Sequence, residues 1–392
     1  MTDVFILSGQ RTAIGDYGKA LKDVPPTKLG EIAIRAALAK SGVEAKDIQQ
    51  VVLGNVIHTE PKDAYVSRVA AVNAGIPVEA PALTVNRLCG SGLQAVVSAA
   101  QSIMLGDASL AVAGGAESMS RGGYLIPSER WGARLGDSKV IDMVVGALND
   151  PFGHGHMGIT AENVAARYGI TREQQDAFSA ESHRRAAAAI AAGHFKEQIT
   201  PVELPSRKGT VIFDTDEHVR AETTAETLAG LKPAFQKDGT VTAGNASGLN
   251  DAGAALVLAS GAEVASRGLK PLARIVAYGH AGVSPEVMGL GPIPASQNAL
   301  RKAGLNIADI DVIESNEAFA AQACAVAKDL GFDPAKVNPN GGAVALGHPI
   351  GASGAIIAIK AIYELHRTGG RYALATMCIG GGQGIAVIFE RV

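Results

Sequence analysis

Cysteines, long hydrophobic runs and clusters of basic residues are all scarce in this sequence. Three cysteines in 392 residues are too few for a disulfide scaffold, which fits a reducing compartment. The formal net charge of −3 and the absence of a basic block argue against binding to nucleic acid or an anionic membrane. No apolar run approaching the ~18 residues of a membrane span is expected. The N-terminal segment MTDVFILSGQRTAIG shows no secretory signal, so we expect a cytoplasmic protein.

Hydrophobic residues make up 47% of the chain, enough to bury a large core in more than one domain. The 47 glycines and many alanines lie between short β-branched segments and amphipathic helical segments. This alternation predicts the α/β class. The glycine clusters GNASG and GHPIGASG lack the G-x-G-x-x-G spacing, no G-x-x-x-x-G-K-[ST] motif occurs, and no βαβ unit can follow CIGGGQG. A dinucleotide-binding fold is therefore disfavoured.

The chain contains an internal duplication. The segment KSGVEAKDIQQVV resembles KAGLNIADIDVI and aligns Gly42 with Gly304. Further on, CGSGLQAVVSAAQSI aligns with GASGAIIAIKAIYEL and matches Ser91 to Ser353. Both alignments have the same offset of 262 residues. The two halves are therefore predicted to share one topology.

Each half is predicted to run strand, helix, strand, helix, strand, glycine-rich turn, helix, strand and closing strand. The closing strands are expected at AALVLAS and IAVIFER. In the first half, more than a hundred residues separate LAVAGG from the closing strand. We interpret them as an inserted lid domain, with one helix capped by Thr171 and Gln174. The expected domains are residues 1–118 plus 250–270 for the N-terminal half, 119–249 for the insertion and 271–392 for the C-terminal half.

Cys89 is the first candidate for a catalytic residue. In PALTVNRLCGSGLQAVV, an apolar strand meets a helix through a glycine-rich turn, which predicts that the thiol lies at a helix N-terminus. Such a position lowers a thiol pKa and exposes a nucleophile. The alternative is a small buried thiol without chemistry, which is the usual role of a free cysteine. This residue alone does not decide between the two.

His348 is the second candidate. In GGAVALGHPIGASG it occupies the turn before the helix that the duplication matches to the helix after Cys89. If the halves pack around a pseudo-two-fold axis, the two turns face each other and the histidine approaches the cysteine. A cysteine beside a histidine base is an activated nucleophile. A lone histidine more often caps a loop, but the flanking glycines and the symmetry favour the catalytic interpretation.

Two further candidates follow predicted strands. Cys378 comes after YALATM, at the carboxyl end where open α/β sheets bind ligands. The glycines after it expose backbone N–H groups suited to an oxyanion hole. Asn316 follows DVIES and is placed to hold a water or a carbonyl, unless it is the N-cap of the next helix. Cys324, which lies among alanines, is interpreted as a core residue.

Five motifs in this order resemble the thiolase family from end to end: NRLCGSGLQA, GNASGLNDAGAA, NEAFA, GHPIGASGA and CIGGGQG. The sequence looks most similar to the bacterial cytoplasmic β-ketothiolases of polyhydroxyalkanoate synthesis. The resemblance implies a thiolase fold, with two duplicated βαβαβαββ halves in a layered αβαβα arrangement and an inserted loop domain. It also implies an acetyl-CoA C-acyltransferase, which joins acetyl-CoA to an acyl-CoA, or cleaves a 3-ketoacyl-CoA, through an acyl-cysteine.

The resemblance also implies the roles of individual residues. Cys89 would be acylated, and His348 would activate it and help to bind the thioester oxygen. Cys378 would be the acid and base for the substrate carbon. Asn316 would hold a water in one oxyanion hole, and the backbone N–H groups of Cys89 and Gly380 would form the other.

In the family the inserted domain holds coenzyme A. Thr227 stands where many relatives have serine, which keeps the hydroxyl but changes its geometry through the added methyl. For Met157, Phe235, Met288 and Phe319 the alternative to substrate binding is ordinary packing, and for His156 it is a surface loop. The matching positions for coenzyme A and the acyl pocket are His156, Met157, Arg220, Thr227, Phe235, Ala243, Ser247, Met288 and Phe319.

The resemblance implies no separate cofactor and no metal, because acetyl-CoA, acyl-CoA and 3-ketoacyl-CoA are substrates. It also implies an oligomer, with a homotetramer expected and a dimer left as the alternative; in the family, dimers pair sheet edges and loops of the insertion join two dimers. Two rival functions remain. A decarboxylating ketoacyl synthase would not need a thiol base such as Cys378. A non-catalytic acyl-CoA-binding protein would be expected to lack Cys89, His348 or Cys378.

Overall fold

The computed structural model describes residues 2–392. The N-terminal half consists of β1 (Val4–Thr12), α1 (Pro26–Ser41), β3 (Gln50–Gly54), α2 (Val66–Asn73), β4 (Ala82–Val85), α3 (Ser91–Leu105), β5 (Leu110–Ser118) and β11 (Asn250–Ser260). The C-terminal half consists of β12 (Ala273–Gly282), α9 (Pro292–Ala303), β13 (Val312–Ser315), α10 (Ala320–Leu330), α11 (Ala343–Leu346), α12 (Ile350–Thr368), β14 (Tyr372–Ile379) and β15 (Gln383–Arg391). Short elements beside them are β2 (Gly15–Asp16), β8 (Ile199–Thr200) and α8 (Gly261–Arg267).

The order of the strands confirms the duplication. The first half has the order β4-β3-β5-β11-β1, and the second has β13-β14-β15-β12. In both halves the strand after the last helix pairs in parallel with the strand that lies between the first two helices, as β5 does with β3 and β14 with β13. The closing strands β11 and β15 pair antiparallel with β5 and β14, at the positions predicted for AALVLAS and IAVIFER.

One strand predicted for the second half does not form. Within residues 2–392, the counterpart of β4 is reduced to a single parallel bridge between Ile313 and Val337. The residues that follow explain the difference. Asn338 has a φ of 43°, which turns the chain out of the extended conformation, and Pro339 has no N–H to donate to a ladder.

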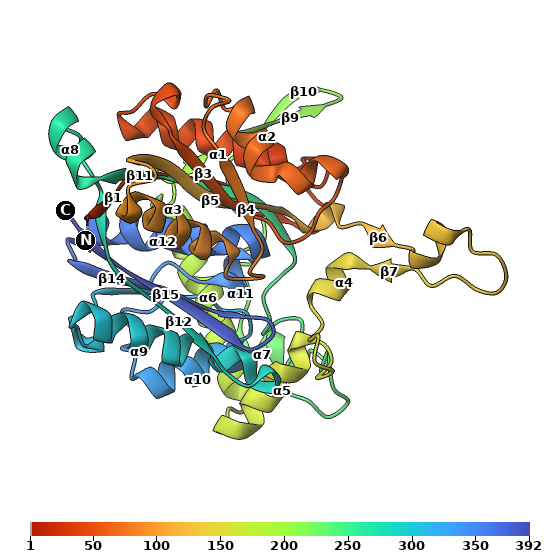
Figure 1. Cartoon of the computed structure of the whole chain (residues 1–392). Helices are drawn as coiled ribbons and strands as arrows, with labels where there is room; N and C mark the ends of the chain where they lie inside the picture. Colours follow the sequence, from red (N-terminus) through yellow and green to blue (C-terminus); the bar gives the residue numbers. More distant parts are fainter. Residues whose placement is uncertain (1) are drawn as a thin grey trace.

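Figure 1 shows α3 and α12 between the strands of the two halves, with α1 and α2 on one outer side and α9 and α10 on the other. The sheets of the two halves join where β1 pairs with β12 over two residue pairs, Phe5 with Arg274 and Ile6 with Ala273. The expected layered αβαβα arrangement is therefore confirmed. Its largest core cluster lies around the central helices and includes Leu93 and Ile356.

The two central helices touch backbone to backbone, because glycines related by the duplication lie at their contact. A Cβ on Gly92 would lie 2.7 Å from the backbone nitrogen of Ala355. A Cβ on Gly354 would lie 2.2 Å from the backbone nitrogen of Leu93. No side chain fits at either position. This contact holds the first turns of α3 and α12 side by side.

The expectation that no segment is long and apolar enough to cross a membrane needs one correction. The window Leu88–Leu105, which contains α3, has 18 residues and a mean hydropathy of 1.3. More than half of this window is buried, because α3 lies between the two halves (Figure 1). Its apolar character is that of a core helix.

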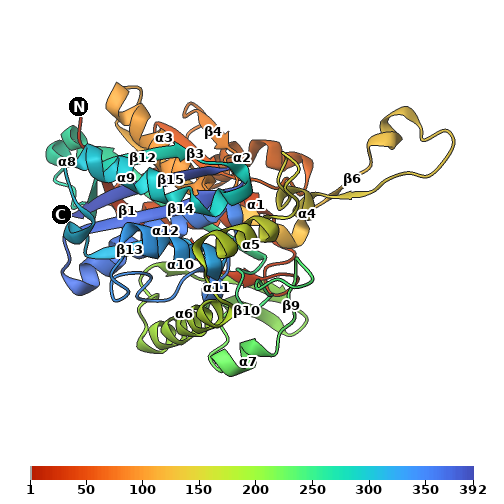
Figure 2. The same ribbon diagram turned by 90° about the horizontal axis from the view of Figure 1, so that it is seen from below.

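Residues 119–249 lie between β5 and β11. The helix predicted to start after Thr171 is α6, and its capping box is confirmed: the Gln174 N–H donates to Thr171 Oγ1 (3.3 Å) and the Thr171 N–H to Gln174 Oε1 (2.9 Å). Figures 1 and 2 both show β6 and β7 on an arm that extends away from the body. The elements of this region are β6 (Tyr124–Leu125), β7 (Ile141–Asp142), α4 (Met143–Ala147), α5 (Met157–Tyr168), α6 (Arg172–Ala192), β9 (Val202–Ser206), β10 (Gly209–Phe213) and α7 (Ala225–Ala229).

A buried ion pair ties this region to the central sheet. The Arg11 side chain, from β1, donates from Nη1 and Nη2 to the two carboxylate oxygens of Asp216, at 2.7 and 2.9 Å. Both side chains are fully buried, and Arg11 also donates from Nε to Gln198 (3.0 Å). A bidentate pair of this kind fixes the relative orientation of the two segments.

Replacement of Gly354 by alanine is expected to destabilise the protein, although alanine is the better helix former. The added Cβ would overlap the Leu93 backbone, and overpacking of a dense core typically costs about 1–3 kcal/mol. Chemical denaturation measures the change in the free energy of unfolding. Gly146→Ala is the control, because nothing lies within 4 Å of a Cβ at that helical position in α4. A Gly354→Ala protein as stable as the control would contradict the close contact.

Candidate active site

One pocket collects most of the predicted catalytic and acyl-binding side chains. Its lining also includes apolar residues that the sequence did not single out, namely Leu88, Ala147, Leu148, Ala318 and Ile350. The residues predicted from the sequence that line it are Cys89, Met157, Ser247, Met288, Phe319, His348 and Gly380.

Cys89 lies in the turn between β4 and α3, directly before the N-cap residue Gly90. The preceding residue, Leu88, has a φ of 45°, a left-handed conformation that costs energy for leucine. Ser91 holds this turn in place, since its Oγ donates to the Leu88 carbonyl (2.7 Å) and accepts from the Arg87 N–H (2.8 Å). The half-buried Cys89 is thereby presented to the pocket on a strained, well-supported turn.

The expected lowering of the Cys89 pKa is wrong. Burial raises the pKa of Cys89 to about 11, even though the N–H groups of Gly380 and of Cys89 itself oppose the rise, and the Glu117 carboxyl adds to it. The helix N-terminus is therefore outweighed by the loss of water around the sulfur. At neutral pH the residue is a thiol, and it needs a base before it can act as a nucleophile.

His348 lines the same pocket as Cys89. His348 is buried in the turn between α11 and α12. Its backbone N–H donates to Asn250 Oδ1 (2.8 Å). The ring atom Nδ1 lies 2.7 Å from Ser353 Oγ, whereas Nε2 has no hydrogen-bond partner within residues 2–392. Burial lowers the pKa of His348 to about 4. The imidazole is therefore neutral at pH 7 and able to accept a proton.

Cys378 is the next-to-last residue of β14 and is fully buried. It does not itself line the pocket but packs behind it, in a cluster with Met157, Met288 and Phe319. Burial raises the pKa of Cys378 far above its usual range, and a charge on Cys89 raises it further. The two thiols therefore lie close enough to interact electrostatically.

The turn between β14 and β15 brings a backbone donor to the nucleophile. Gly381 and Gly382 have φ values of 81° and 87°, which only glycine adopts without strain. The Gly380 N–H faces the Cys89 sulfur and acts to lower its pKa. This donor is suited to stabilise negative charge that develops next to the sulfur.

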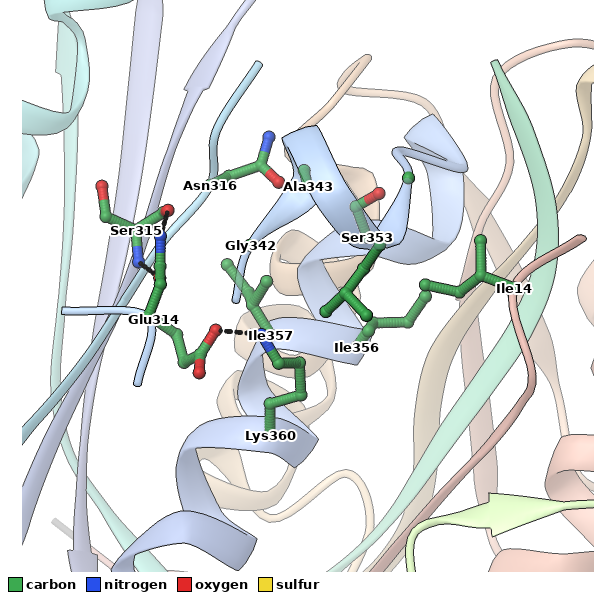
Figure 3. Close-up of a pocket in the computed structure, with 13 residues that line it drawn as sticks. Ile14, Glu314, Ser315, Asn316, Gly342, Ala343, Ser353, Ile356, Ile357 and Lys360 are labelled. Atoms are coloured by element: carbon green, nitrogen blue, oxygen red, sulfur yellow. Dashed lines mark hydrogen bonds and ion pairs between the residues drawn. The ribbon is translucent and has the colours of Figure 1, made fainter. Parts of the chain in front are cut away.

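Asn316 directly follows β13, and its N–H donates to the Thr376 carbonyl (2.9 Å). It is not the N-cap of α10, because that helix begins at Ala320 with Phe319 as the N-cap. Asn316 lines a smaller cavity together with Ser353, the residue that contacts His348 (Figure 3). Its Nδ2 has no protein partner among the described residues. The amide is therefore available for a substrate or a water.

Aromatic rings form a wall next to the pocket. His156 is the N-cap of α5, and its Nδ1 accepts the Gly158 N–H (3.0 Å). Its ring stacks on Phe235 with centroids 4.7 Å apart, and Phe235 meets Phe319 edge to face at 6.1 Å. His156 therefore caps a helix and packs on an aromatic ring, rather than lying in a free surface loop.

Three residues predicted to hold coenzyme A lie outside the pocket on exposed segments: Arg220, Thr227 and Ala243. Thr227 is in α7, where its Oγ1 accepts the Thr224 backbone N–H (3.0 Å) as part of a capping box and also donates to the Thr224 carbonyl (2.8 Å). The backbone N–H of Arg220 donates to His183 Nδ1 (3.2 Å), and the residue itself is exposed. The structure does not bring these side chains to the thiols.

The sequence did not identify the residues that hold the catalytic turns. Glu117, fully buried at the end of β5, accepts N–H groups from Val56 (3.1 Å), Ile57 (3.1 Å) and Gly351 (2.9 Å). Because Gly351 is the second residue of α12, Glu117 ties the His348 turn to the first half. A carboxyl residue at the carboxyl end of a buried strand was a signal for Glu117, and the duplication had already matched Ser353 to Ser91.

Comparisons with known proteins agree along the whole chain. The model of the thiolase N-terminal domain matches residues 4–262, and that of the thiolase C-terminal domain matches residues 269–391. The chain is 64% identical to beta-ketothiolase BktB of Cupriavidus necator over 100% of this chain and 99% of that protein. It is 51% identical to an acetyl-CoA acetyltransferase of Pseudomonas aeruginosa, over 100% of both.

Solved structures of related enzymes also match the whole chain. The acetyl-CoA acetyltransferase of Bacillus anthracis superposes with a TM-score of 0.98 at 47% identity, over 100% of this chain and 99% of that one. Human mitochondrial 3-ketoacyl-CoA thiolase in complex with CoA gives a TM-score of 0.96 at 45% identity, over 100% and 98%. With two family models covering nearly all of its length and relatives this similar, the chain belongs to the thiolase family.

Proposed function

We propose that this protein is a β-ketothiolase, an acyl-CoA C-acyltransferase that condenses acetyl-CoA with an acyl-CoA and cleaves 3-ketoacyl-CoA in the reverse direction. The observation that carries the proposal is the meeting of a Cys89 thiol, a neutral His348 and the Gly380 N–H around one pocket, with a second thiol directly behind it. The relatives named beta-ketothiolase and acetyl-CoA acetyltransferase support the same reaction.

In the first step the Cys89 sulfur attacks the thioester carbon of an acyl-CoA while its proton passes to Nε2 of His348. The bond from the carbonyl carbon to the sulfur of coenzyme A then breaks, and the departing thiolate takes that proton. The negative charge on the thioester oxygen is stabilised by the N–H groups of Cys89 and Gly380. One donor of this kind typically contributes ~100- to 1,000-fold in rate.

In the second step Cys378 passes its own proton to the neutral His348, and the Cys378 thiolate then removes a proton from the methyl carbon of acetyl-CoA. The resulting enolate carbon attacks the acyl group, the bond to the Cys89 sulfur breaks, that sulfur takes the proton from His348, and the 3-ketoacyl-CoA product forms. A strongly raised pKa makes Cys378 a strong base once it is deprotonated, which suits a weakly acidic C–H bond. Asn316 and His348 are proposed to hold the enolate oxygen, Asn316 through a water.

The charge interaction between the two thiols supports this order of steps. A charge on Cys89 raises the pKa of Cys378, so a thiolate at one sulfur disfavours a thiolate at the other. Once Cys89 carries an acyl group it has no charge. Deprotonation of Cys378 then becomes easier at the stage when its basicity is needed.

The residues around the thiols are proposed to bind the rest of the substrate. His156 and Phe235 of the aromatic wall, together with Met157, are suited to the pantetheine arm, and the exposed Arg220 is suited to the phosphates. Ser247 lines the pocket. Its backbone N–H already donates to the Ala318 carbonyl (3.0 Å), so its hydroxyl is the group proposed to contact the substrate. Further contacts to coenzyme A and to the acyl group are proposed for Thr227, Ala243, Met288 and Phe319.

We further propose that residues 119–249 form a domain inserted within the N-terminal half, which comprises residues 1–118 and 250–270, that residues 271–392 form the C-terminal half, and that the chain assembles as a homotetramer. Two features support this assembly. The strand β4 lies at the end of the strand order with its Leu83 about half exposed, which is an edge open to pairing. The extended arm of β6 and β7 carries the 84% exposed Trp131, which suits a contact with another chain.

Incubation with acetyl-CoA should acetylate Cys89, because this thiol has a base and an oxyanion donor at one pocket. Mass spectrometry of the quenched protein is expected to show a labile acetyl group on the Cys89 peptide, and none in Cys89→Ala. Cys324→Ala, which removes the remaining thiol at a distance from the pocket, should retain the adduct. An acetyl group on Cys324, or no adduct under any condition, would contradict the assignment and favour a binding protein.

Replacement of Cys378 by alanine should separate the two steps. Acyl transfer to Cys89 removes no proton from carbon and is expected to persist, whereas turnover should fall at least ~100-fold, the lower end for loss of a general base. In deuterated water, NMR of acetyl-CoA reports exchange of the methyl protons, which should vanish in the variant. Exchange at the wild-type rate would show that another residue is the base, as in a mechanism without a second thiol.

Replacement of Arg220 by alanine is expected to raise KM for CoA substrates several-fold, with a smaller effect on kcat, because a phosphate contact lies far from the reacting carbon. Steady-state thiolysis of magnesium–acetoacetyl-CoA, followed by its absorbance, gives both constants. Arg207→Ala is the control, since Arg207 is an exposed arginine of the same insertion. An unchanged KM with a collapsed kcat would place Arg220 in folding or chemistry instead.

A further inference from the structure

Ser353 lies in the first turn of α12 and lines the small cavity that Asn316 also lines (Figure 3). Its side chain is buried. Ser353 Oγ lies 2.7 Å from His348 Nδ1 and donates to the Pro349 carbonyl at 2.9 Å. The proposed catalytic histidine therefore has one side-chain partner, and that partner also bonds to the backbone.

The hydrogens of this arrangement can be counted. A serine hydroxyl has one hydrogen, and the Pro349 carbonyl can only accept. When Ser353 gives its hydrogen to that carbonyl, the short contact with the imidazole requires that Nδ1 carries a hydrogen and donates. The opposite arrangement would place a hydrogen on Nε2, where residues 2–392 offer no acceptor. A buried N–H without a partner is costly, so the first arrangement is favoured.

The duplicated serine of the first half shows the same pattern without ambiguity. Ser91 donates to the Leu88 carbonyl (2.7 Å) and accepts from the Arg87 N–H (2.8 Å). Both of its partners are backbone groups, so their roles as acceptor and donor are fixed. In the second half the carbonyl is again a backbone group, but the donor position is taken by the imidazole of His348. The repeat thus uses the equivalent serine to hold two different turns, although Ser91 donates to the carbonyl three residues back and Ser353 to the carbonyl four residues back.

We infer that Ser353 is a positioning residue, which holds His348 in the tautomer with the hydrogen on Nδ1 and the lone pair on Nε2. The Asn250 side chain holds the backbone of the same residue, so the ring has both a fixed position and a fixed proton. The inference rests on the proposed function, in which Nε2 takes the proton of Cys89. A histidine in the wrong tautomer cannot serve as that base, whatever its position.

Solid-state NMR of protein labelled with ¹⁵N-histidine tests the tautomer without reference to activity. The spectrum of His348→Asn identifies the His348 signals by their absence. We expect a protonated Nδ1 and an unprotonated Nε2 in the wild-type protein. In Ser353→Ala the two tautomers should mix, and kcat should fall roughly ten- to a hundred-fold, toward the range for loss of a general base, with KM nearly unchanged.

Two control variants separate this role from a structural one. Ser353→Thr keeps the hydroxyl and should retain the wild-type tautomer and most of the activity. Ser179→Ala removes another buried helical hydroxyl, which donates to the Gln175 carbonyl (2.8 Å), and should change neither. A wild-type Nε2 that carries the hydrogen, or a Ser353→Ala protein with unchanged tautomer, would overturn the inference. Absence of acetyl-Cys89 in the wild type would instead overturn the proposed function.

Discussion

The backbones of α3 and α12 meet without intervening side chains, and the positions of the proposed nucleophile and base both follow from this contact. Cys89 lies two residues before α3, and His348 lies two residues before α12. When Gly92 and Gly354 allow the helices to touch at their first turns, the two preceding turns are brought to the same pocket. Glu117 completes the link, because it accepts from the N–H of Gly351 in α12. Catalytic geometry here is a consequence of helix packing.

Burial sets the electrostatic character of the site. It raises the pKa of both thiols and lowers that of His348, so the resting site is neutral. Charge appears only as the reaction proceeds, next to N–H groups that are already in place. Such fixed donors need no reorganisation when charge develops. The histidine must therefore carry its single hydrogen on the correct nitrogen in the resting state, which gives the contact of Ser353 its importance.

The sequence predicted the features that depend on local pattern and on the repeat. The constant offset of 262 residues was enough to predict the paired halves, and the glycine-rich turns located Cys89 and His348 before their helices. The pKa of Cys89 was predicted in the wrong direction, because burial depends on the packing of distant segments. The sequence also did not predict that the strand expected near Val337 would be reduced to a single bridge, or that Ser353 would contact His348. Pairing and hydrogen bonding of these residues are decided by tertiary contacts.

The two duplicated halves contribute different reactive residues to the pocket. The position equivalent to Cys89 in the second half is Gly351, and the position equivalent to Cys378 in the first half is Ala116. Each half therefore retains only part of the reactive set, and neither contains a complete centre. The single pocket is a composite of two once-equivalent modules, so covalent linkage in one polypeptide guarantees that they meet in a one-to-one ratio. The two halves share one topology, and differences between them at a few positions place the proposed nucleophile in one half and the proposed bases in the other.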